Sequence, residues 1–288
     1  MRAAVIREGK LAVEERPEPE GELRIRVRAA GVNNADLIQR AGHYPAPPGA
    51  PADIPGLECA GETEDGRRVM ALLGGGGQAE VVVVDARHVL DVPAGLDDVQ
   101  AGGFMEAFCT AHDALFTQAQ LQAGDRLLVN GAAGGVGVAA VQLGVDARAK
   151  VTANARHHHA ELQALGADTD VDGEYDVIVE LVGGENLQQN LLRLATGGRI
   201  VIIGTGAGRR AEIDFGPLMA KRGRISASTL RARSADEKAK VVRRLAGLDL
   251  ERFTVPVEAA YPLAEVEAAY ERFAQGGKFG KIVVTFDT

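Results

Sequence analysis

The chain has 288 residues, of which 46% are hydrophobic and 25% charged, and its formal net charge is −8. This length suits about two domains and allows a sizeable core that needs no disulfide or metal staple. The acidic balance argues against a nucleic acid or an anionic membrane as the main partner. Two cysteines are too few for a disulfide framework. The first fifteen residues carry charges throughout and have no apolar signal core, so we expect a cytoplasmic protein.

The first hundred residues are predicted to be rich in β-strands. Glycine and proline separate short segments that alternate between apolar and polar residues or are wholly apolar. Examples are ELRIRVRAA (22–30), RRVMALL (67–73) and AEVVVV (79–84). A proline-rich stretch, YPAPPGAPADIPG (44–56), is too irregular for a helix or a central strand and is predicted to be a loop.

From about Phe108 the pattern changes to apolar strands that alternate with helices. The predicted strands are RLLVN, KVTAN, YDVIVELVG, RIVIIG and RISAS, and the predicted helices are 135–147, 157–165, 185–194 and 235–247. Such alternation is typical of a parallel sheet buried on both faces. After Leu248 the strand-like pattern returns. We therefore expect an α/β protein in which residues 1–107 and 250–288 form one domain and residues 108–249 form the other.

Residues 130–142, NGAAGGVGVAAVQ, form a glycine-rich turn between a predicted strand and a predicted helix. Gly134 and Gly137 occupy two of the three glycine positions of the dinucleotide fingerprint, and Ala132 stands at the first. Gly134 would let the main chain approach a pyrophosphate, and Gly137 would let helix and strand pack closely. A tight turn that binds nothing is the alternative. The context favours a dinucleotide along Ala133, Gly134, Gly135 and Val136.

The residues after the second strand bear on which dinucleotide binds. An NAD site usually has an acidic residue there, but this strand ends in Asn154 and is followed by ARHHH. Arg156 and the histidines 157–159, among them His158, could meet a 2′-phosphate, because arginine grips phosphate with two bonds. The alternatives are a solvated basic loop and a metal-binding histidine tract. We predict NADP (NADPH) as the cofactor.

At this point the chain resembles a family. It is similar to the zinc-independent quinone oxidoreductase branch, which includes zeta-crystallin, of the medium-chain dehydrogenase/reductase superfamily. The matching segments follow one another along nearly the whole chain: 31–49, 54–62, 107–115, 121–144, 181–184, 197–204, 228–234 and 280–284. The resemblance implies a GroES-like, β-rich catalytic domain, a Rossmann-type domain with a cofactor cleft between the two, a small-molecule substrate and a homodimer.

The resemblance also implies site residues. The catalytic set would be Asn33, Asp36 and Tyr44, in which an amide and a phenol can donate hydrogen bonds to a substrate oxygen. Turn and capping chemistry for Asn33 and Asp36, and loop packing for Tyr44, are the alternatives. The remaining cofactor contacts implied by the matched segments are Thr110, Val182, Gly183, Ile203, Gly204 and Arg231. Thr110 could instead be a helix N-cap, and Arg231 a surface charge.

A metal site is not expected. The resemblance places Asn33 and Leu57 where zinc-dependent relatives have a cysteine and a histidine, and neither residue is a good zinc ligand. Glu58 alone does not make a site. Cys59 and Cys109 are interpreted as small buried hydrophobic residues.

The chain also departs from the family. Only ADTDVDG separates the helix at 157–165 from the strand that begins near Tyr175. That connection is too short to return across roughly three strand spacings of ~4.8 Å. We therefore predict that the usual third, edge strand at 168–172 is missing or reduced. The acidic residues in this connection would oppose a 2′-phosphate. Relatives also have glycine and serine where this chain has Asn154 and Ala155, so the usual phosphate-binding hydroxyl is absent.

Three functions compete on this basis. The first is hydride transfer from NADPH to a quinone or a similar α,β-unsaturated carbonyl. The second is an enoyl or alkenal reductase on the same scaffold. The third is a redox sensor that binds NADPH without catalysis. The sequence favours the first.

Overall fold

The computed structural model describes residues 1–287, and these form two compact units. The first unit comprises residues 1–109 and 230–287, and the second comprises residues 110–229. Helix α8 (Ala235–Leu245), which the sequence placed in the second domain, therefore groups with the first unit. Its start is fixed there by His88, whose Nε2 lies 2.8 Å from the Ala235 carbonyl, and by an ion pair between Arg87 and Asp236. Helical periodicity predicts the helix but not the unit to which it belongs.

The first unit is built mainly of strands. Its elements are β1 (Arg2–Arg7), β2 (Lys10–Glu15), β3 (Arg24–Val32), α1 (Asn34–Arg40), β4 (Glu58–Thr63), β5 (Arg68–Leu72), β6 (Val81–Val83), β7 (Val89–Asp91), α2 (Asp98–Ala101), α3 (Met105–His112, which crosses into the second unit), α8, β13 (Val257–Pro262), α9 (Val266–Ala274) and β14 (Lys281–Thr285). A seven-stranded sheet has the order β13-β14-β3-β4-β5-β7, with β6 also paired to β3. Strands β1 and β2 form a separate antiparallel ribbon.

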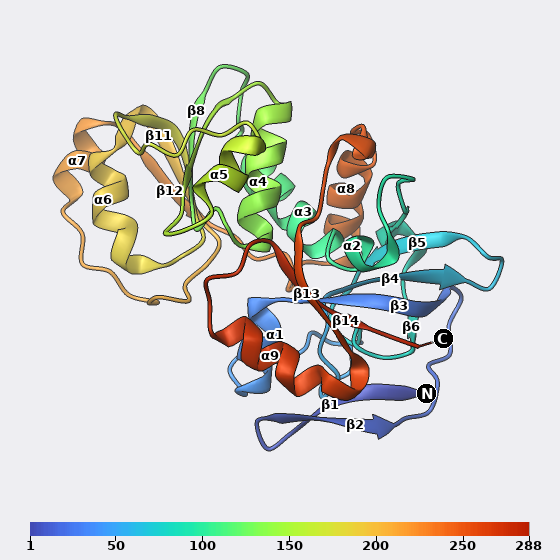
Figure 1. Ribbon diagram of the computed structural model, residues 1–288. Helices are drawn as coiled ribbons and strands as arrows, with labels where there is room; N and C mark the ends of the chain where they lie inside the picture. Colours follow the sequence, from blue (N-terminus) through green and yellow to red (C-terminus); the bar gives the residue numbers. More distant parts are fainter. Residues whose placement is uncertain (288) are drawn as a thin grey trace. The chain divides into compact units, whose positions relative to one another are not determined.

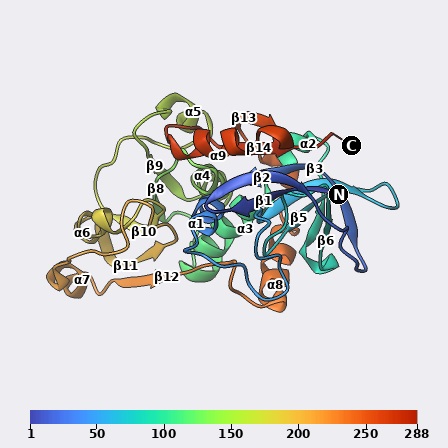
Figure 2. The ribbon, with the colours of Figure 1, turned by 90° about the horizontal axis from the view of Figure 1, so that it is seen from below.

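The core of this unit follows from alternation in its strands. In β3, Ile25 and Val27 are fully buried while Arg26 between them is exposed, as expected where one sheet face is packed and the other is solvated. Helix α9 covers part of the packed face next to β13 and β14 (Figure 2). It contributes Tyr270, which is fully buried and donates from its hydroxyl to Gln78 Oε1 at 2.9 Å.

The second unit holds a five-stranded sheet in which every pairing is parallel. Its elements are β8 (Arg126–Asn130), α4 (Gly135–Asp146), β9 (Lys150–Asn154), α5 (His159–Ala164), β10 (Tyr175–Glu180), α6 (Leu187–Leu192), β11 (Leu194–Ile202), α7 (Phe215–Ala220) and β12 (Arg224–Ala227) (Figure 1). The strand order is β12-β11-β10-β8-β9. The predicted Rossmann-type sheet is thus confirmed.

The predicted reduction of the edge strand is also confirmed. Where a third strand would lie beside β9, the structure has one isolated parallel bridge between Thr152 and Asp168. Two backbone bonds hold it: Ala153 N donates to Asp168 O at 2.7 Å, and Asp168 N donates to Val151 O at 2.8 Å. The chain then leaves the sheet and enters β10, as the short connection requires.

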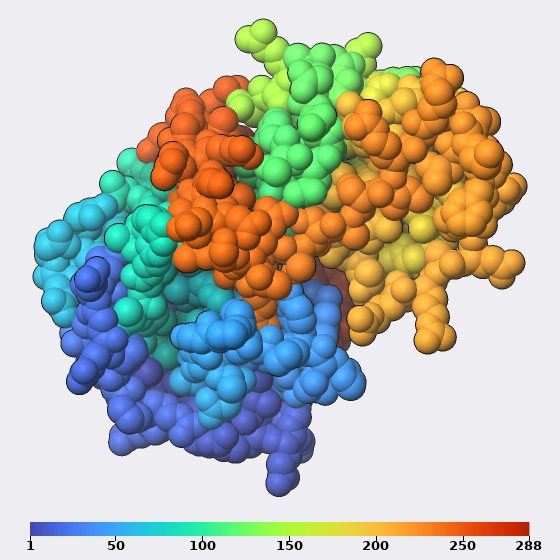
Figure 3. Space-filling view, turned by 180° about the vertical axis from the view of Figure 1, so that it is seen from behind, coloured from blue at the N-terminus to red at the C-terminus, as the bar shows by residue number. Residues whose placement is uncertain are grey.

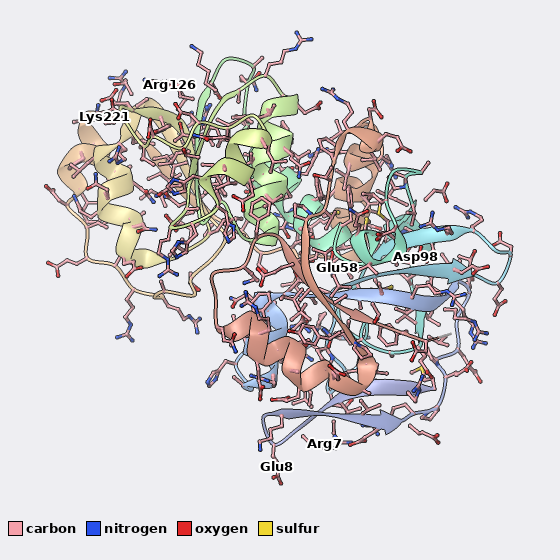
Figure 4. The ribbon with its side chains drawn as sticks, in the orientation of Figure 1. Arg7, Glu8, Glu58, Asp98, Arg126 and Lys221 are labelled. Atoms are coloured by element: carbon pink, nitrogen blue, oxygen red, sulfur yellow. The ribbon has the colours of Figure 1, made fainter. Side chains whose placement is uncertain are left out.

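The strand order places a topological switch point between β8 and β10, because the chain runs from β8 to β9 on one side and then returns to β10 on the other. In open parallel sheets, ligands bind at the carboxyl ends of strands beside such a point. Figure 4 labels Arg126 and Lys221 at the opposite edge, where β8 and β12 begin. No helix in residues 1–287 is both long and apolar enough to cross a bilayer.

Candidate functional site

The glycine turn lies at the carboxyl end of β8 and leads into α4. Its main chain is tied to the end of β9, since Gly131 N and Ala132 N both donate to the Asn154 carbonyl at 3.0 and 3.1 Å. The fold itself requires two of its glycines. Gly131 has a φ of +81°, which favours glycine, and a Cβ on Gly137 would stand 2.4 Å from Gly131 O.

Gly134 differs, because the protein around it does not require a glycine. Its φ of −77° and ψ of 167° suit any residue, and a Cβ there would meet only Gly131 O, at 3.7 Å. Gly134 is also the N-cap of α4, where the first backbone N–H groups lack helical acceptors and the helix dipole favours an anion. The open space at Gly134 therefore fits a pyrophosphate that approaches the main chain.

The other predicted cofactor contacts in this unit lie at the same edge of the sheet. Asn154 ends β9, Val182 and Gly183 follow β10, and Ile203 and Gly204 follow β11. The last two are held against β10, because both of their amides donate to the Glu180 carbonyl. Val182 lies beside the turn, since its Cγ2 would stand 3.1 Å from a Cβ on Gly131.

A buried polar network underlies this edge. Glu180, which is 1% exposed, accepts five hydrogen bonds through its two carboxylate oxygens. Its Oε1 accepts from Val182 N at 2.7 Å, Gly183 N at 3.0 Å and Asn186 Nδ2 at 3.3 Å. Its Oε2 accepts from the Nδ2 atoms of Asn130 and Asn190, both at 2.8 Å. The network reaches the surface through Asn154, whose Nδ2 donates to Asn130 Oδ1 at 2.8 Å.

The predicted 2′-phosphate contacts lie just beyond Asn154. Arg156 is exposed. His158 has a left-handed backbone, with φ of 70°, and its Nδ1 lies 2.9 Å from Glu161 Oε1. That contact lowers the pKa of Glu161. A carboxylate thus stands beside His158, so Arg156 is the stronger candidate for an anion contact.

In the first unit, three polar side chains meet within the sheet. Lys281 Nζ lies 2.6 Å from Glu58 Oε1 and donates to Asn33 Oδ1 at 2.7 Å, while Asn33 Nδ2 donates to Glu58 Oε1 at 2.9 Å. The Lys281 and Glu58 side chains are 4% and 0% exposed. Figure 4 labels Glu58, which comes from β4. The Asn33 amide is therefore fixed in one orientation by an ion pair.

Glu106, in the first turn of α3, joins this cluster. Its backbone N donates to Glu58 Oε2 at 2.8 Å. Burial first, and the neighbouring charge of Glu58 second, raise the pKa of the Glu106 carboxyl to about 8. Glu106 therefore carries its proton over most of the neutral range and can act as a donor.

The structure places Asp36 in a capping role. It is fully buried, and its two oxygens accept from Asn33 N at 2.8 Å and Gly56 N at 3.0 Å. Burial raises the pKa of the Asp36 carboxyl to about 6, against the opposing effect of these two bonds. Asp36 thus ties the start of α1 to the loop before β4, and it can act on a substrate only through the residues that it orients.

Tyr44 and Arg231 lie together. The Arg231 guanidinium lies 4.9 Å from the centre of the Tyr44 ring and donates to the Tyr44 carbonyl at 3.2 Å. It also donates to Gly74 O at 2.9 Å and to Gln39 Oε1 at 2.6 Å. At 3% exposure Arg231 is not the surface charge considered as an alternative. It anchors the loop that carries Tyr44, and its contact with cofactor phosphates stays a prediction.

Thr110 lies inside α3 and is 8% exposed, so its alternative role as an N-cap is wrong. Sequence reasoning gave no site role to Lys281, Glu106 or Glu180. A signal was present for Lys281 and Glu180, because each is a charged residue next to three consecutive apolar residues of its strand. Such a charge must find partners when it is buried.

Two family models match the chain. The alcohol dehydrogenase GroES-like domain matches residues 19–94, and a model described as zinc-binding dehydrogenase matches residues 143–284.

Among curated proteins, the quinone oxidoreductase of Lama guanicoe is 32% identical, over 92% of this chain and 89% of its own length. Erythronolide synthase EryA2 of Saccharopolyspora erythraea is 33% identical over 94% of this chain, which spans only 8% of that much longer protein. Among solved structures, the quinone oxidoreductase of Thermus thermophilus, determined alone and with NADPH, is 33% identical with a TM-score of 0.85. That match covers 99% of this chain and 100% of the other.

Zinc, which the description of the second family model implies, does not fit the residues found here. Asn33 Oδ1 and Glu58 Oε1, the oxygens that could bind a cation here, already accept from the Lys281 ammonium. Leu57 offers no ligand atom. Within residues 1–287, no group of three or more histidine, cysteine or acidic side chains is placed to hold a metal ion.

A nicotinamide cofactor, in contrast, fits the glycine turn and the open space at Gly134. The identity to complete quinone oxidoreductases extends over nearly their whole length. The chain therefore belongs to the medium-chain dehydrogenase/reductase superfamily, as an oxidoreductase of its quinone oxidoreductase branch.

Proposed function

We propose that the chain is an NADPH-dependent reductase of quinones or similar α,β-unsaturated carbonyls, and that it works without zinc. The observation that carries the proposal is the open backbone at Gly134, at the N-terminus of α4 and beside the switch point. The Thermus relative, described in complex with NADPH, supports this choice of cofactor.

NADPH, when bound, supplies the hydride. Charge then develops on the substrate oxygen, so a fixed donor there lowers the barrier. One hydrogen of Asn33 Nδ2 goes to Glu58, and we assign the second to the substrate oxygen. Lys281 holds the other end of that amide, so Asn33 need not reorganise during the reaction. We assign Tyr44 the role of a second donor, positioned by Arg231.

Turnover is the first test. We expect the purified chain to oxidise NADPH with a panel of quinones, enals and enoyl thioesters. The enoyl thioesters belong in the panel because of the similarity to a segment of a polyketide synthase. Tyr44→Phe should reduce the rate with an enal more than the rate with a quinone, since general-acid help is worth ~10²–10⁴-fold where the chemistry depends on it. Tight NADPH binding without turnover of any substrate would instead favour the redox-sensor function.

The metal-free reaction is tested separately. Elemental analysis of active protein should find no stoichiometric zinc, and prior treatment with a chelator should leave the rate unchanged. A rate that requires zinc at one equivalent would contradict the proposal.

The cofactor preference is tested at Arg156. A bond to a charged group is worth ~1.5–3 kcal/mol, so Arg156→Ala should raise the dissociation constant of NADPH much more than that of NADH. Lys150→Ala is a matched control, because Lys150 is an exposed cation at the other end of β9. Equal weakening of both cofactors would show that Arg156 does not read the 2′-phosphate.

We also propose a homodimer. Strand β12 is an edge of the parallel sheet, and Leu192, Phe215 and Met219 near it are 54%, 61% and 75% exposed. These side chains come from α6 and α7, which contact each other, and the orange atoms of the α7 region lie at the surface of the second unit (Figure 3). Exposed apolar patches of this kind mark interaction surfaces. Light scattering should give twice the chain mass, and Phe215→Asp together with Met219→Asp should give monomers.

A further inference from the structure

The buried network at the carboxyl edge of the second sheet has a fixed hydrogen-bond polarity. All five groups that contact Glu180 are N–H donors, so both of its oxygens act as acceptors. Because a carboxylate has no hydrogen to give, Asn130 must turn its Nδ2 toward Glu180. Asn130 Nδ2 also donates to Asn190 Oδ1 at 2.8 Å, which fixes the same orientation.

The orientation of Asn130 determines that of Asn154. Because Asn130 Nδ2 is directed at Glu180, Asn130 Oδ1 faces Asn154. Asn154 must therefore donate to it from its own Nδ2. The acceptor Oδ1 of Asn154 is then directed away from Asn130, on the outer side of this exposed residue, with the second hydrogen of Nδ2 beside it. Amide orientation is here a consequence of the network, because the reversed amide would place two acceptors or two donors face to face.

The position of Asn154 makes the orientation of its amide relevant to cofactor binding. Asn154 ends the strand after the glycine turn, and its carbonyl accepts from Gly131 N and Ala132 N. In dinucleotide-binding sheets, the side chain at the end of this strand contacts the adenosine ribose. An acceptor there suits a ribose hydroxyl, whereas a donor suits a 2′-phosphate.

We propose that Glu180 is a positioning residue for cofactor selection, which acts through Asn130 to hold Asn154 with its acceptor facing the ribose. The inference rests on the proposed function, because it needs a dinucleotide in this site. Asn154 then favours the free 2′-hydroxyl of NADH and opposes the preference that Arg156 gives for NADPH. The native chain should accordingly bind both cofactors.

The isosteric substitution Glu180→Gln should reverse the direction of hydrogen bonds in this network. In Glu180→Gln, Oε1 can keep its bonds from Val182 N and Gly183 N while Nε2 becomes a donor toward Asn130 and Asn190. Both asparagines can turn over and accept from it, and Asn190 Nδ2 then donates to Asn130 Oδ1. Asn130 next directs Nδ2 at Asn154, which accepts with Oδ1 and points its own Nδ2 outward. Each bond along this path is kept with its direction reversed.

The test is the ratio of dissociation constants for NADH and NADPH, measured by nicotinamide fluorescence on the purified full chain at one salt concentration. Glu180→Gln should shift this ratio about tenfold toward NADPH, which corresponds to ~1.4 kcal/mol. A residue that only supported the fold would weaken both cofactors together. Asp176→Asn is the matched control, because Asp176 lies on the same strand but faces Arg126 at the far end. It should leave the ratio unchanged.

Asn154→Ala tests whether Glu180 acts on cofactor binding through Asn154 or only by supporting the fold. Asn154 is exposed, so its removal takes no buried side chain from the core and costs the network one hydrogen bond, the one to Asn130 Oδ1. It should weaken NADH more than NADPH, and Glu180→Gln should cause no further shift in its presence. An unchanged ratio in folded Glu180→Gln would overturn the inference. If that variant does not fold, equal effects of Asn154→Ala on both cofactors would overturn it. If the native chain binds neither cofactor, the proposed function fails, and the inference fails with it.

Discussion

The buried pair of Lys281 and Glu58 sets the cost of changing either residue alone. Removing one partner of a buried ion pair leaves an uncompensated charge and costs ~3–5 kcal/mol. We therefore expect Lys281→Met to lower the free energy of unfolding by about that amount, as measured by urea denaturation. Lys281→Met combined with Glu58→Gln should cost less than the sum of the single changes, because no charge is then left unpaired. Additive costs would show that the two side chains act independently.

The same pair explains why catalysis at Asn33 needs no metal in our proposal. A cation is already present, in the form of the Lys281 ammonium, and it is covalently part of the chain. The pair fixes the amide from both ends. The resemblance places Asn33 and Leu57 where zinc-dependent relatives have metal ligands, but the sequence did not reveal the ion pair beside Asn33.

At the scale of elements, the turn between β8 and α4 contains two glycines that we expect to be required for different reasons, one for packing and the other for cofactor binding. Gly137→Ala should destabilise the protein, because its Cβ would stand 2.4 Å from a backbone oxygen. Gly134→Ala should leave the melting temperature nearly unchanged, since its Cβ meets no protein atom closer than 3.7 Å. Gly134→Ala should nevertheless weaken NADPH binding by crowding the pyrophosphate. A large loss of stability in Gly134→Ala would mean that this glycine serves the fold instead.

The sequence predicted those elements that depend only on neighbouring residues. The apolar strands, the glycine turn and the reduced edge strand follow from periodicity, punctuation and the length of a connection. The unit to which α8 belongs does not follow from such patterns, because an amphipathic helix can pack in either unit. The Glu180 network was also missed. Its bonds join residues as far apart as Asn130 and Asn190, and only the tertiary structure brings these side chains together.

At the scale of the whole molecule, stability should depend on pH through two groups of carboxyls whose pKa values are shifted in opposite directions. Several exposed or half-buried carboxyls, such as Asp85 with a pKa lowered to about 2, are ionised and bonded in the folded state. They stabilise the protein above their unfolded pKa values, and this contribution is lost in acid. Asp36 and Glu106, whose pKa values are raised to about 6 and about 8, act in the opposite sense. The folded state holds their protons more tightly than the unfolded chain does.

The sign follows from proton linkage. Between the ordinary pKa of a glutamate, 4.5, and the raised value of about 8, folded Glu106 binds more protons than the unfolded chain. Its contribution to stability is therefore complete below pH 4.5 and falls as the pH rises toward 8. We expect the urea midpoint to be highest near about pH 5 and to decline toward about pH 8. Glu106→Gln, which cannot ionise, should flatten the decline in the upper half of that range, whereas Glu20→Gln, a change at an exposed site, should not. Parallel pH profiles for the native chain and Glu106→Gln would show that Glu106 ionises freely in the folded protein.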